Sequence, residues 1–264
     1  MINIENDFIK VSVNKLEWDT AHFGMPMASM EIEVKKEIES YESINRTIQE
    51  ALQAAKDNGI KHVTLKLNPG LKKVIHVCQE NGFRLMDTRI EYIFDYGRTE
   101  IKEINDKCTL RTAGKEEMET LIDISKESFK NYIDRFHSDE NIDNAKADEL
   151  YELWVKNSYS GYAQLVYAAE VDGKIVGFST FKDFVEKDKK GNNIGEIVLS
   201  AVSEAARGKG VYTSMINYGV KLGKGKMDYL LVKTQIDNLA VQKAWASLGF
   251  KPYKNEYIFH LFNK

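Results

Sequence analysis

The stretch "SAVSEAARGKGVYTSMI", Ser200 to Ile216, decides the fold because it joins a strand pattern to a helix pattern through a corner of glycines and cations. Backbone N–H groups in the first turn of a helix lack internal partners, and the helix dipole adds partial positive charge there. Glycines let an anion approach that backbone closely, and Arg207 and Lys209 add charge. The corner therefore predicts a site for a phosphate or a pyrophosphate. A glycine-rich turn with solvated cations is the alternative interpretation.

Two common phosphate-binding motifs do not describe this corner. The spacing GxxxxGK[ST] of a Walker A loop is absent, and "RGKGVY" lacks the third glycine of the dinucleotide fingerprint. The order of elements around the corner has to carry the interpretation instead.

Two distant segments of the chain resemble each other: "HVTLKLNPGLKKVIHVCQENGFRLMDTRIEYIFDY" from His62 and "YLLVKTQIDNLAVQKAWASLGFKPYKNEYIFHLF" from Tyr229. Each predicts a strand, a helix that ends in Gly-Phe, and a strand with Glu-Tyr-Ile-Phe. A diverged duplication explains the match better than coincidence between two αβαβ units. It predicts an N-terminal unit over residues 1–104 and a C-terminal unit over 105–264, joined by the polar run "GRTEIKEINDK".

The composition restricts the class of protein. The chain has 264 residues, 43% of them hydrophobic and 29% charged, and this is typical of a globular protein with an ample core. A formal net charge of −3 argues against a general nucleic-acid partner. Two cysteines without a CxxC pair indicate neither a disulfide framework nor a zinc-finger site, and no metal is predicted. No signal peptide and no apolar run of membrane-spanning length are present, so we expect a cytoplasmic protein without a membrane partner.

The order strand, "ARGKGVYTSMI", helix, strand, "NLAVQKAWASLGF", strand resembles that of the GNAT N-acyltransferase superfamily. Its acyl-CoA loop, [Gln/Arg]-x-x-Gly-x-[Gly/Ala], is matched from Arg207 to Val211 and departs at Tyr212. The second family motif, Asn followed after seven residues by Tyr and four later by Gly-Phe, is present as Asn238, Trp245 and Gly249-Phe250. The resemblance implies a mixed α/β GNAT fold, with a degenerate GNAT-like N-terminal half packed on a catalytic C-terminal half.

The resemblance also implies acetyl-CoA or another acyl-CoA as co-substrate, with no metal. The strand before the corner would pair with the pantetheine arm, the loop amides would hold the pyrophosphate, and Asn238 would bind near the pantetheine. The implied cofactor-binding residues are Ser200, Val202, Arg207, Gly208, Lys209, Gly210, Val211, Tyr212, Thr213 and Asn238.

Further segments, "LEWDTAHFGMPMASMEIE" and "YIDRFHSD" with its surroundings, are similar to the dTDP-fucosamine acetyltransferase group. This implies a nucleotide-linked amino-deoxysugar as the acyl acceptor, in surface-polysaccharide biosynthesis. Arginine can bind a sugar-nucleotide phosphate and aromatic rings can stack on bases and sugars. The candidate substrate-binding residues are Phe23, Tyr132, Arg135, Phe136 and His137; core anchoring of the two phenylalanines is the alternative.

Acyl transfer to an amine needs a group that accepts the amine proton. Glu196 is one candidate, on the strand before the corner and, by alternation, on the same face as Ser200 and Val202. A solvated carboxylate at the strand edge is the alternative. His137 is the rival base, because its reference pKa lies near neutrality.

The general acid is a further open point, because the resemblance places a tyrosine where this chain has Trp245. An indole N–H donates hydrogen bonds but does not ionise usefully. The thiolate leaves without an acid, or Tyr212, Tyr253 or Tyr257 supplies the proton, or the chain has lost activity. Trp245 also suits packing against an acyl or pantetheine chain.

Three functional hypotheses follow. The first is an acyl-CoA-dependent enzyme that acylates a nucleotide-linked amino sugar. The second is a related enzyme acting on a protein N-terminus or a small amine. The third is a non-catalytic acyl-CoA-binding regulator. A homodimer stays open as a possible assembly.

Overall fold

The structure, a computed structural model, describes residues 1–38, 40–130 and 132–263. Its contacts divide the chain into two compact units that are interleaved in sequence. Unit 1 comprises Met1–Arg89, Ile133–Lys146 and Asn255–Lys264, and unit 2 comprises Ile90–Tyr132 and Ala147–Lys254. The division after residue 104 stays a prediction, and the two compact units are each made of segments from both sides of that residue.

Unit 1 is a mixed sheet in the order β1-β2-β3-β4-β11. Strands β1, β2 and β3 are antiparallel, β3 and β4 are parallel, and β4 and β11 are antiparallel. The elements are β1 (Ile2–Glu5), β2 (Ile9–Lys15), α1 (Glu17–Phe23), β3 (Met27–Val34), α2 (Tyr41–Asp57), β4 (His62–Leu67) and α3 (Lys72–Glu80), with the end of β11 (Lys251–Phe262) and the start of β5 (Arg84–Asp95).

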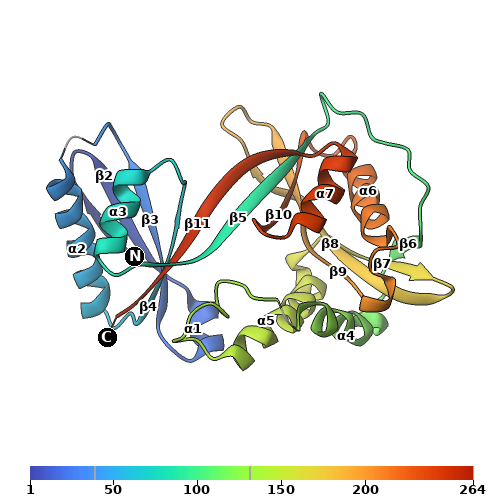
Figure 1. Ribbon diagram of the computed structural model, residues 1–264, viewed down its shortest axis with the longest axis horizontal. Coiled ribbons are helices and arrows are strands. Elements are labelled where there is room, and N and C mark those ends of the chain that lie inside the picture. The colour runs from blue at the N-terminus through green and yellow to red at the C-terminus, as the bar shows by residue number, and fades with distance from the viewer. Residues whose placement is uncertain (39, 131, 264) are drawn as a thin grey trace. The chain divides into compact units, whose positions relative to one another are not determined.

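The helices α2 and α3 bury their apolar stripes against one face of this sheet (Figure 1). Alternate residues of β4, Val63, Leu65 and Leu67, face them, as the two-residue period of a strand requires. On α2, Ile44 and Ile48 are fully buried at the spacing that places side chains on one helix face. The intervening residues of β4, beginning with His62, consequently lie on the other face.

Unit 2 is a second mixed sheet in the order β5-β10-β9-β8-β7-β6. Neighbours from β6 to β9 are antiparallel, and β9 pairs with β10 in parallel. The elements are the second part of β5, then β6 (Thr109–Thr112), a short 3-10 turn (Lys115–Glu117), α4 (Met118–Phe129), α5 (Asn144–Asn157), a π-helical turn (Ser158–Tyr162), β7 (Leu165–Val171), β8 (Lys174–Lys187), β9 (Asn193–Val202), a 3-10 turn (Glu204–Ala206), α6 (Val211–Gly223), β10 (Tyr229–Gln235), α7 (Leu239–Leu248) and the start of β11.

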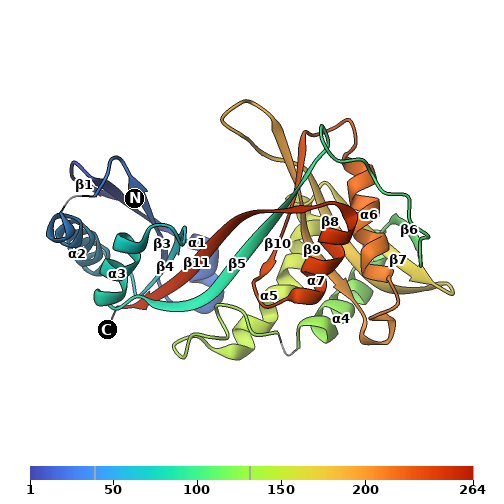
Figure 2. The ribbon, with the colours of Figure 1, turned by 45° about the horizontal axis from the view of Figure 1, so that its top comes forward.

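Two apolar layers sandwich this second sheet. Helices α6 and α7 share one core with the sheet, including Met215 and Trp245, while α4 and α5 share the other core, including Leu121 and Tyr151. Figure 2 shows α6 and α7 side by side in unit 2. The predicted mixed α/β architecture is confirmed.

The predicted repeat corresponds to matching element orders. The first segment forms β4-α3-β5 and the second forms β10-α7-β11, preceded by α2 and α6 respectively. Both glycines at the predicted helix ends, Gly82 and Gly249, have left-handed backbone conformations, with φ of 91° and 101°. Among the described residues, no helix is long and apolar enough to cross a membrane.

Candidate active site

The parallel strands β9 and β10 part from each other near the predicted corner. Their pairing runs from Tyr229 opposite Ile194 to Val232 opposite Ile197. Strand β9 nevertheless continues to Val202, and β10 continues to Gln235. Within the described chain, β9 beyond Ile197 has no pairing with β10, so this edge of β9 can pair with an extended ligand.

A bulge in β9 changes which face each candidate residue occupies. Ser200 lies opposite Ser179 and Ile197 lies opposite Phe181, so three steps on β9 match two on β8. Ile197 and Ser200 therefore share a face, and Glu196 lies on the opposite one. The expectation from simple alternation that Glu196 shares a face with Ser200 and Val202 was wrong, because alternation fails where an extra residue is inserted.

Glu196 is a partly buried carboxylate with a cationic partner on β10. Its Oε1 lies 3.1 Å from Nζ of Lys233, and its side chain is 14% exposed. The parallel register places Glu196 opposite Leu231, two residues before Lys233 and therefore on the same face. The carboxylate thus lies beside the point where β9 and β10 part.

The loop between β9 and α6 has the backbone that its glycines predict. Gly208 and Gly210 have φ of 73° and 83°, a left-handed conformation that side chains with a Cβ rarely adopt. Gly210 is the residue before helix α6, and no side chain caps this helix end. The first-turn N–H groups are therefore available to an anion.

The two cations of the loop differ in their contacts. Arg207 donates from Nε to the carbonyl of Val202 at 3.3 Å and from a terminal nitrogen to the carbonyl of Ser128 at 3.1 Å. Arg207 thus ties the loop to the end of β9 and to α4, while Lys209 is exposed.

The remaining cofactor candidates surround the same strand ends. Ser200 shares a hydrogen bond of 2.6 Å between hydroxyl oxygens with Ser179, and the carbonyl of Val202 also accepts from the Ser128 hydroxyl at 3.1 Å. Asn238 precedes α7 and donates from Nδ2 to the Thr234 hydroxyl at 3.0 Å. The other candidates, Val211, Tyr212 and Thr213, form the first turn of α6.

Trp245 and Tyr212 form a direct pair between α7 and α6. The indole Nε1 donates to the Tyr212 hydroxyl oxygen at 3.1 Å, and Trp245 is 2% exposed. Burial raises the pKa of Tyr212 above its usual range, and the hydrogen bond from Trp245 offsets this in part. The phenol therefore keeps its proton at neutral pH. Of the three tyrosines considered as a substitute acid, Tyr253 is 55% exposed and Tyr257 belongs to unit 1.

Most of the predicted substrate-binding residues belong to unit 1 and have internal contacts there. Phe136 is 2% exposed, and its ring centroid lies 4.8 Å from that of Phe23. Arg135 lies over the Phe136 ring at 4.3 Å, and His137 Nδ1 lies 2.8 Å from Oδ1 of Asp134. Phe23, Arg135 and Phe136 thus pack together, and His137 contacts Asp134. Their role toward substrate stays a prediction.

Tyr132 is the candidate of this group that belongs to unit 2. Its ring packs edge-on against Phe129 and Tyr151, with centroid separations of 5.5 and 6.1 Å. It therefore joins the aromatic layer between α4 and α5.

Sequence reasoning missed several polar groups. Ser179 and Lys233 gave no motif signal. A buried cluster of His62, Asp139 and His260 in unit 1 was also not predicted. The available signal was a histidine within each of two apolar strand patterns, but nothing in the sequence relates those strands to Asp139.

Comparison with known proteins agrees with this geometry. The model of the acetyltransferase (GNAT) family matches residues 118–250, half of the chain, and this stretch holds β9, the glycine loop, α6, β10 and α7. The chain belongs to the acetyltransferase (GNAT) family and is an acyltransferase. No curated protein sequence matches it.

Solved structures share the fold at low sequence identity. A GCN5-related N-acetyltransferase from Sphaerobacter thermophilus is 12% identical, with 96% of this chain and 76% of that chain covered and a TM-score of 0.63. A tandem GNAT protein from the clavulanic acid biosynthesis pathway is 12% identical, with 90% and 76% covered and a TM-score of 0.60. A GCN5-related N-acetyltransferase from Kribbella flavida is 12% identical, with 98% and 88% covered and a TM-score of 0.59.

Proposed function

We propose that the protein transfers an acetyl or another short acyl group from acyl-CoA to the amino group of a nucleotide-linked amino-deoxysugar. The observation that carries the acyl-CoA part is the parting of β9 and β10 directly beside an uncapped helix with left-handed glycines before it. A strand edge and a helix N-terminus suit the two halves of CoA, since an amide-containing arm pairs with a strand and a pyrophosphate binds helix amides.

The pantetheine arm would bind along β9 from Val198 to Val202, on the edge that β10 leaves. The pyrophosphate would bind the amides from Gly208 to Thr213, with Lys209 near its charge. Arg207 was expected to add charge for the pyrophosphate, but its guanidinium donates to the carbonyls of Val202 and Ser128. Its main contribution would be to keep the loop in shape.

The chemical step needs one proton removed and one supplied. The neutral amine attacks the thioester carbonyl, the carbon–nitrogen bond forms, and the carbon–sulfur bond breaks. Glu196 would take the amine proton directly or through a water, and Tyr212 would donate a proton to the departing sulfur. Tyr212 suits this role because Trp245 already donates to its oxygen, which leaves its own hydrogen free for an acceptor.

The nucleotide-sugar acceptor rests on the sequence resemblance of residues near Phe23 and His137. A protein N-terminus or a small amine as acceptor, and a regulator that binds acyl-CoA without turnover, are the competing outcomes. The Tyr212–Trp245 pair favours an enzyme over a regulator, because it preserves a hydroxyl donor beside the position of the missing tyrosine.

Thiol release from acetyl-CoA in the presence of dTDP- and UDP-linked amino sugars tests the proposal. We expect turnover with at least one of these acceptors and none with the matching sugar that lacks the amine. Turnover confined to peptides or polyamines would replace the acceptor, and tight CoA binding without turnover on any amine would favour the regulator.

The loop itself is tested by Gly208→Asp, with Gly225→Asp as control. Both glycines have left-handed φ, 73° and 75°, and neither has an atom within 4 Å of an added Cβ. The backbone strain of the two variants is therefore similar, but the carboxylate of the first would repel the pyrophosphate. Calorimetry should show weaker CoA binding for Gly208→Asp alone; equal affinity in both variants would remove the loop from the site.

A further inference from the structure

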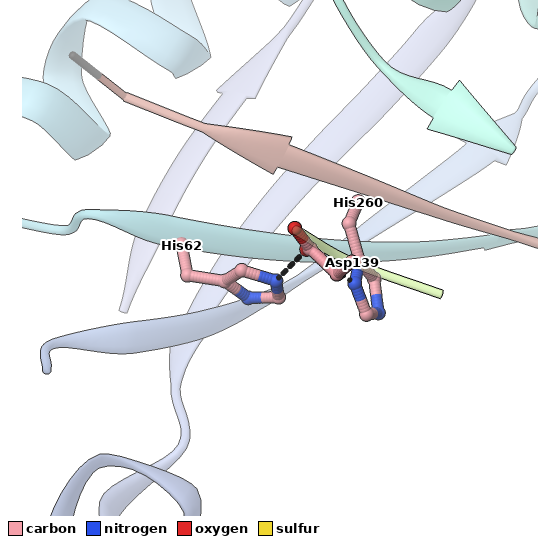
Figure 3. A group of neighbouring side chains, drawn as sticks. All are labelled: His62, Asp139 and His260. Atoms are coloured by element: carbon pink, nitrogen blue, oxygen red, sulfur yellow. Dashed lines mark hydrogen bonds and ion pairs between the residues drawn. The ribbon is translucent and has the colours of Figure 1, made fainter. Parts of the chain in front are cut away.

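The face of the unit 1 sheet opposite α2 and α3 holds a buried polar cluster. His62 on β4, His260 on β11 and Asp139 in the segment Ile133–Lys146 are 0%, 2% and 3% exposed. Figure 3 shows His62 and His260 on either side of the Asp139 carboxylate. Asp139 Oδ2 lies 3.1 Å from Nε2 of His62 and 2.9 Å from Nδ1 of His260.

The two strands fix both imidazoles relative to each other. In the antiparallel register, His62 lies opposite Phe262 and His260 lies opposite Thr64. The two histidines are therefore diagonal neighbours on one face of the sheet. Their ring centroids are 4.4 Å apart.

The third side chain is brought by a segment that unit 1 holds firmly. Phe136 packs on Phe23, the Lys146 ammonium donates to the His22 carbonyl at 2.7 Å, and Nε2 of His22 lies 2.7 Å from the Lys146 carbonyl. Asp139 is thus fixed by contacts on both sides of it in the sequence.

The Asp139 carboxylate is also oriented by its own neighbours. Oδ1 accepts from the backbone N–H of Asn141 at 3.0 Å and from its side-chain Nδ2 at 2.9 Å. This leaves Oδ2 directed at the two histidines. Metal-binding carboxylates are held by hydrogen bonds to their outer oxygen in the same way.

We propose that His62 Nε2, His260 Nδ1 and Asp139 Oδ2 bind a structural divalent cation, with Zn²⁺ as the ion that fits them best. The three ligand atoms lie within 4.8 Å of one another. Two imidazole nitrogens and one carboxylate oxygen are ligands that Zn²⁺ accepts, at about 2.0–2.2 Å. The two separations from Asp139 Oδ2, 3.1 and 2.9 Å, are close to the edge of a tetrahedron around such an ion.

The charge balance favours a cation. A buried carboxylate without a full countercharge is costly, and Asp139 is 3% exposed. The nearby cation Arg135 interacts electrostatically with Asp134, Asp19 and Asp87 as well as with His260, so one arginine faces several carboxylates. A divalent ion would supply positive charge, and each neutral ring would then carry its proton on the other nitrogen, Nδ1 of His62 and Nε2 of His260.

The ion would fasten Ile133–Lys146 to the sheet. Because the ligands are almost inaccessible to solvent, the ion would be taken up as unit 1 folds. The three ligands belong to unit 1, whereas the glycine loop and the Tyr212–Trp245 pair belong to unit 2. The fastened segment itself carries Arg135, Phe136 and His137, which are predicted to bind the acceptor.

The test uses the full chain without an affinity tag of histidines. The protein is unfolded with a chelator, refolded, and titrated with Zn²⁺ against a chromophoric chelator. We expect one equivalent to bind, and thermal unfolding of the chelated protein to occur at a lower temperature than that of the Zn²⁺-loaded protein. Uptake well below one equivalent would overturn the proposal and leave the cluster as a hydrogen-bonded contact.

Variants locate the ion. Asp139→Asn and His260→Gln should weaken Zn²⁺ binding by at least about 100-fold, since even outer partners of such ligands are worth 10–100-fold. His76→Gln, which changes an exposed histidine of the same unit, should bind as the unchanged protein does. Unaltered affinity in Asp139→Asn and His260→Gln would overturn the proposal.

A measurement on the unchanged protein covers variants that fail to fold. X-ray absorption of the Zn²⁺-loaded protein should show two imidazoles and oxygen ligands without sulfur. Sulfur ligation would place the ion at Cys78 or Cys108 and would overturn the assignment.

Discussion

At the residue scale, the pair of Tyr212 and Trp245 explains two departures from the family pattern together. Tyr212 stands where the acyl-CoA loop has a small residue, and Trp245 stands where a tyrosine is expected. Tyr212 alone would replace a small loop residue, and Trp245 alone would remove a phenol. Together they place the Tyr212 hydroxyl at the contact of α6 and α7, where it accepts a hydrogen bond of 3.1 Å from Trp245. Compensation of this kind cannot be recognised from either motif separately.

Replacing Tyr212 by Phe should lower kcat by about 100-fold or more, because general acid catalysis typically contributes that much. CoA affinity, measured by calorimetry, should change little, since the loop backbone is retained. Tyr218→Phe on the same helix is the control. An unchanged kcat in Tyr212→Phe would mean that the thiolate leaves without an acid.

Trp245→Phe should have a smaller effect, because it removes the hydrogen-bond partner of the proposed acid Tyr212 and keeps Tyr212 itself. The loss of one hydrogen bond corresponds to about 2- to 10-fold in kcat. Trp245→Tyr restores the residue that the family places here and should keep at least the parent activity. If Trp245→Phe loses more activity than Tyr212→Phe, the indole has a role of its own.

At the scale of elements, helix α6 packs its Gly219 directly against side chains of β9 and β7. A Cβ added at Gly219 would lie 2.6 Å from Ile197 Cδ1 and 2.9 Å from the Tyr167 hydroxyl. Alanine favours a helix by about 1 kcal/mol over glycine, but overpacking of this kind costs about 1–3 kcal/mol. The crowding should outweigh the propensity, because Ile197 and Tyr167 are both buried and the Tyr167 hydroxyl donates to the Met215 carbonyl at 3.0 Å.

Gly219→Ala should therefore lower the free energy of unfolding by about 1 kcal/mol or more, measured by urea denaturation. Adding Ile197→Val should recover part of the loss, since it removes the nearer contact. If Gly219→Ala is as stable as the parent, α6 has room to move away from β9.

The contact between β6, the turn that follows it and β7 depends on an ionic group. Arg111 donates to both Glu117 and Glu170, and the Gly114 amide donates to Glu117 at 2.7 Å. The Arg111 guanidinium lowers the pKa of Glu117 to about 2. Because the folded pKa lies below the ordinary value, this contribution to stability is present above about pH 4.5 and is lost as the pH falls toward 2.

Glu117→Gln should consequently be less stable than the parent at pH 7, and the difference should shrink as the pH falls from 5 toward 2. Chemical denaturation at several pH values measures this. Glu116→Gln, at the exposed neighbouring position, is the control. A difference that stays constant down to pH 2 would mean that Glu117 acts through packing.

The sequence predicted elements better than it predicted faces and partners. The corner at Gly208–Gly210 and the two αβαβ segments were correct, because glycine conformation and hydrophobic period are local properties. The face of Glu196 was wrong, because one inserted residue in β9 reverses the alternation. In unit 1, Phe136 and Asp139 contact residues that are far away in the sequence, and a local sequence pattern cannot predict such contacts.

At the scale of the whole molecule, each compact unit draws its core from both halves of the sequence. The core of unit 2 includes Ile90, Tyr92 and Phe94, which precede residue 105. The core of unit 1 includes Phe259, from the last strand of the chain. The two predicted halves are thus interdependent, since neither of them contains a complete core.

This interdependence predicts how fragments behave. The fragment 105–264 lacks three buried side chains of the unit 2 core, and truncating a single buried aromatic typically costs about 3–5 kcal/mol. Their combined loss, together with that of a strand, should be as large as the 5–15 kcal/mol by which a domain is usually stable. The fragment should therefore lack a cooperative thermal transition, and mixing with fragment 1–104 during refolding should restore one. A chain cleaved at the exposed turn Lys189–Lys190, within the β8–β9 hairpin, is the control. It should stay folded, because the cut removes no residue from either core. Cooperative unfolding of 105–264 alone would show that the predicted division after residue 104 marks a self-sufficient domain.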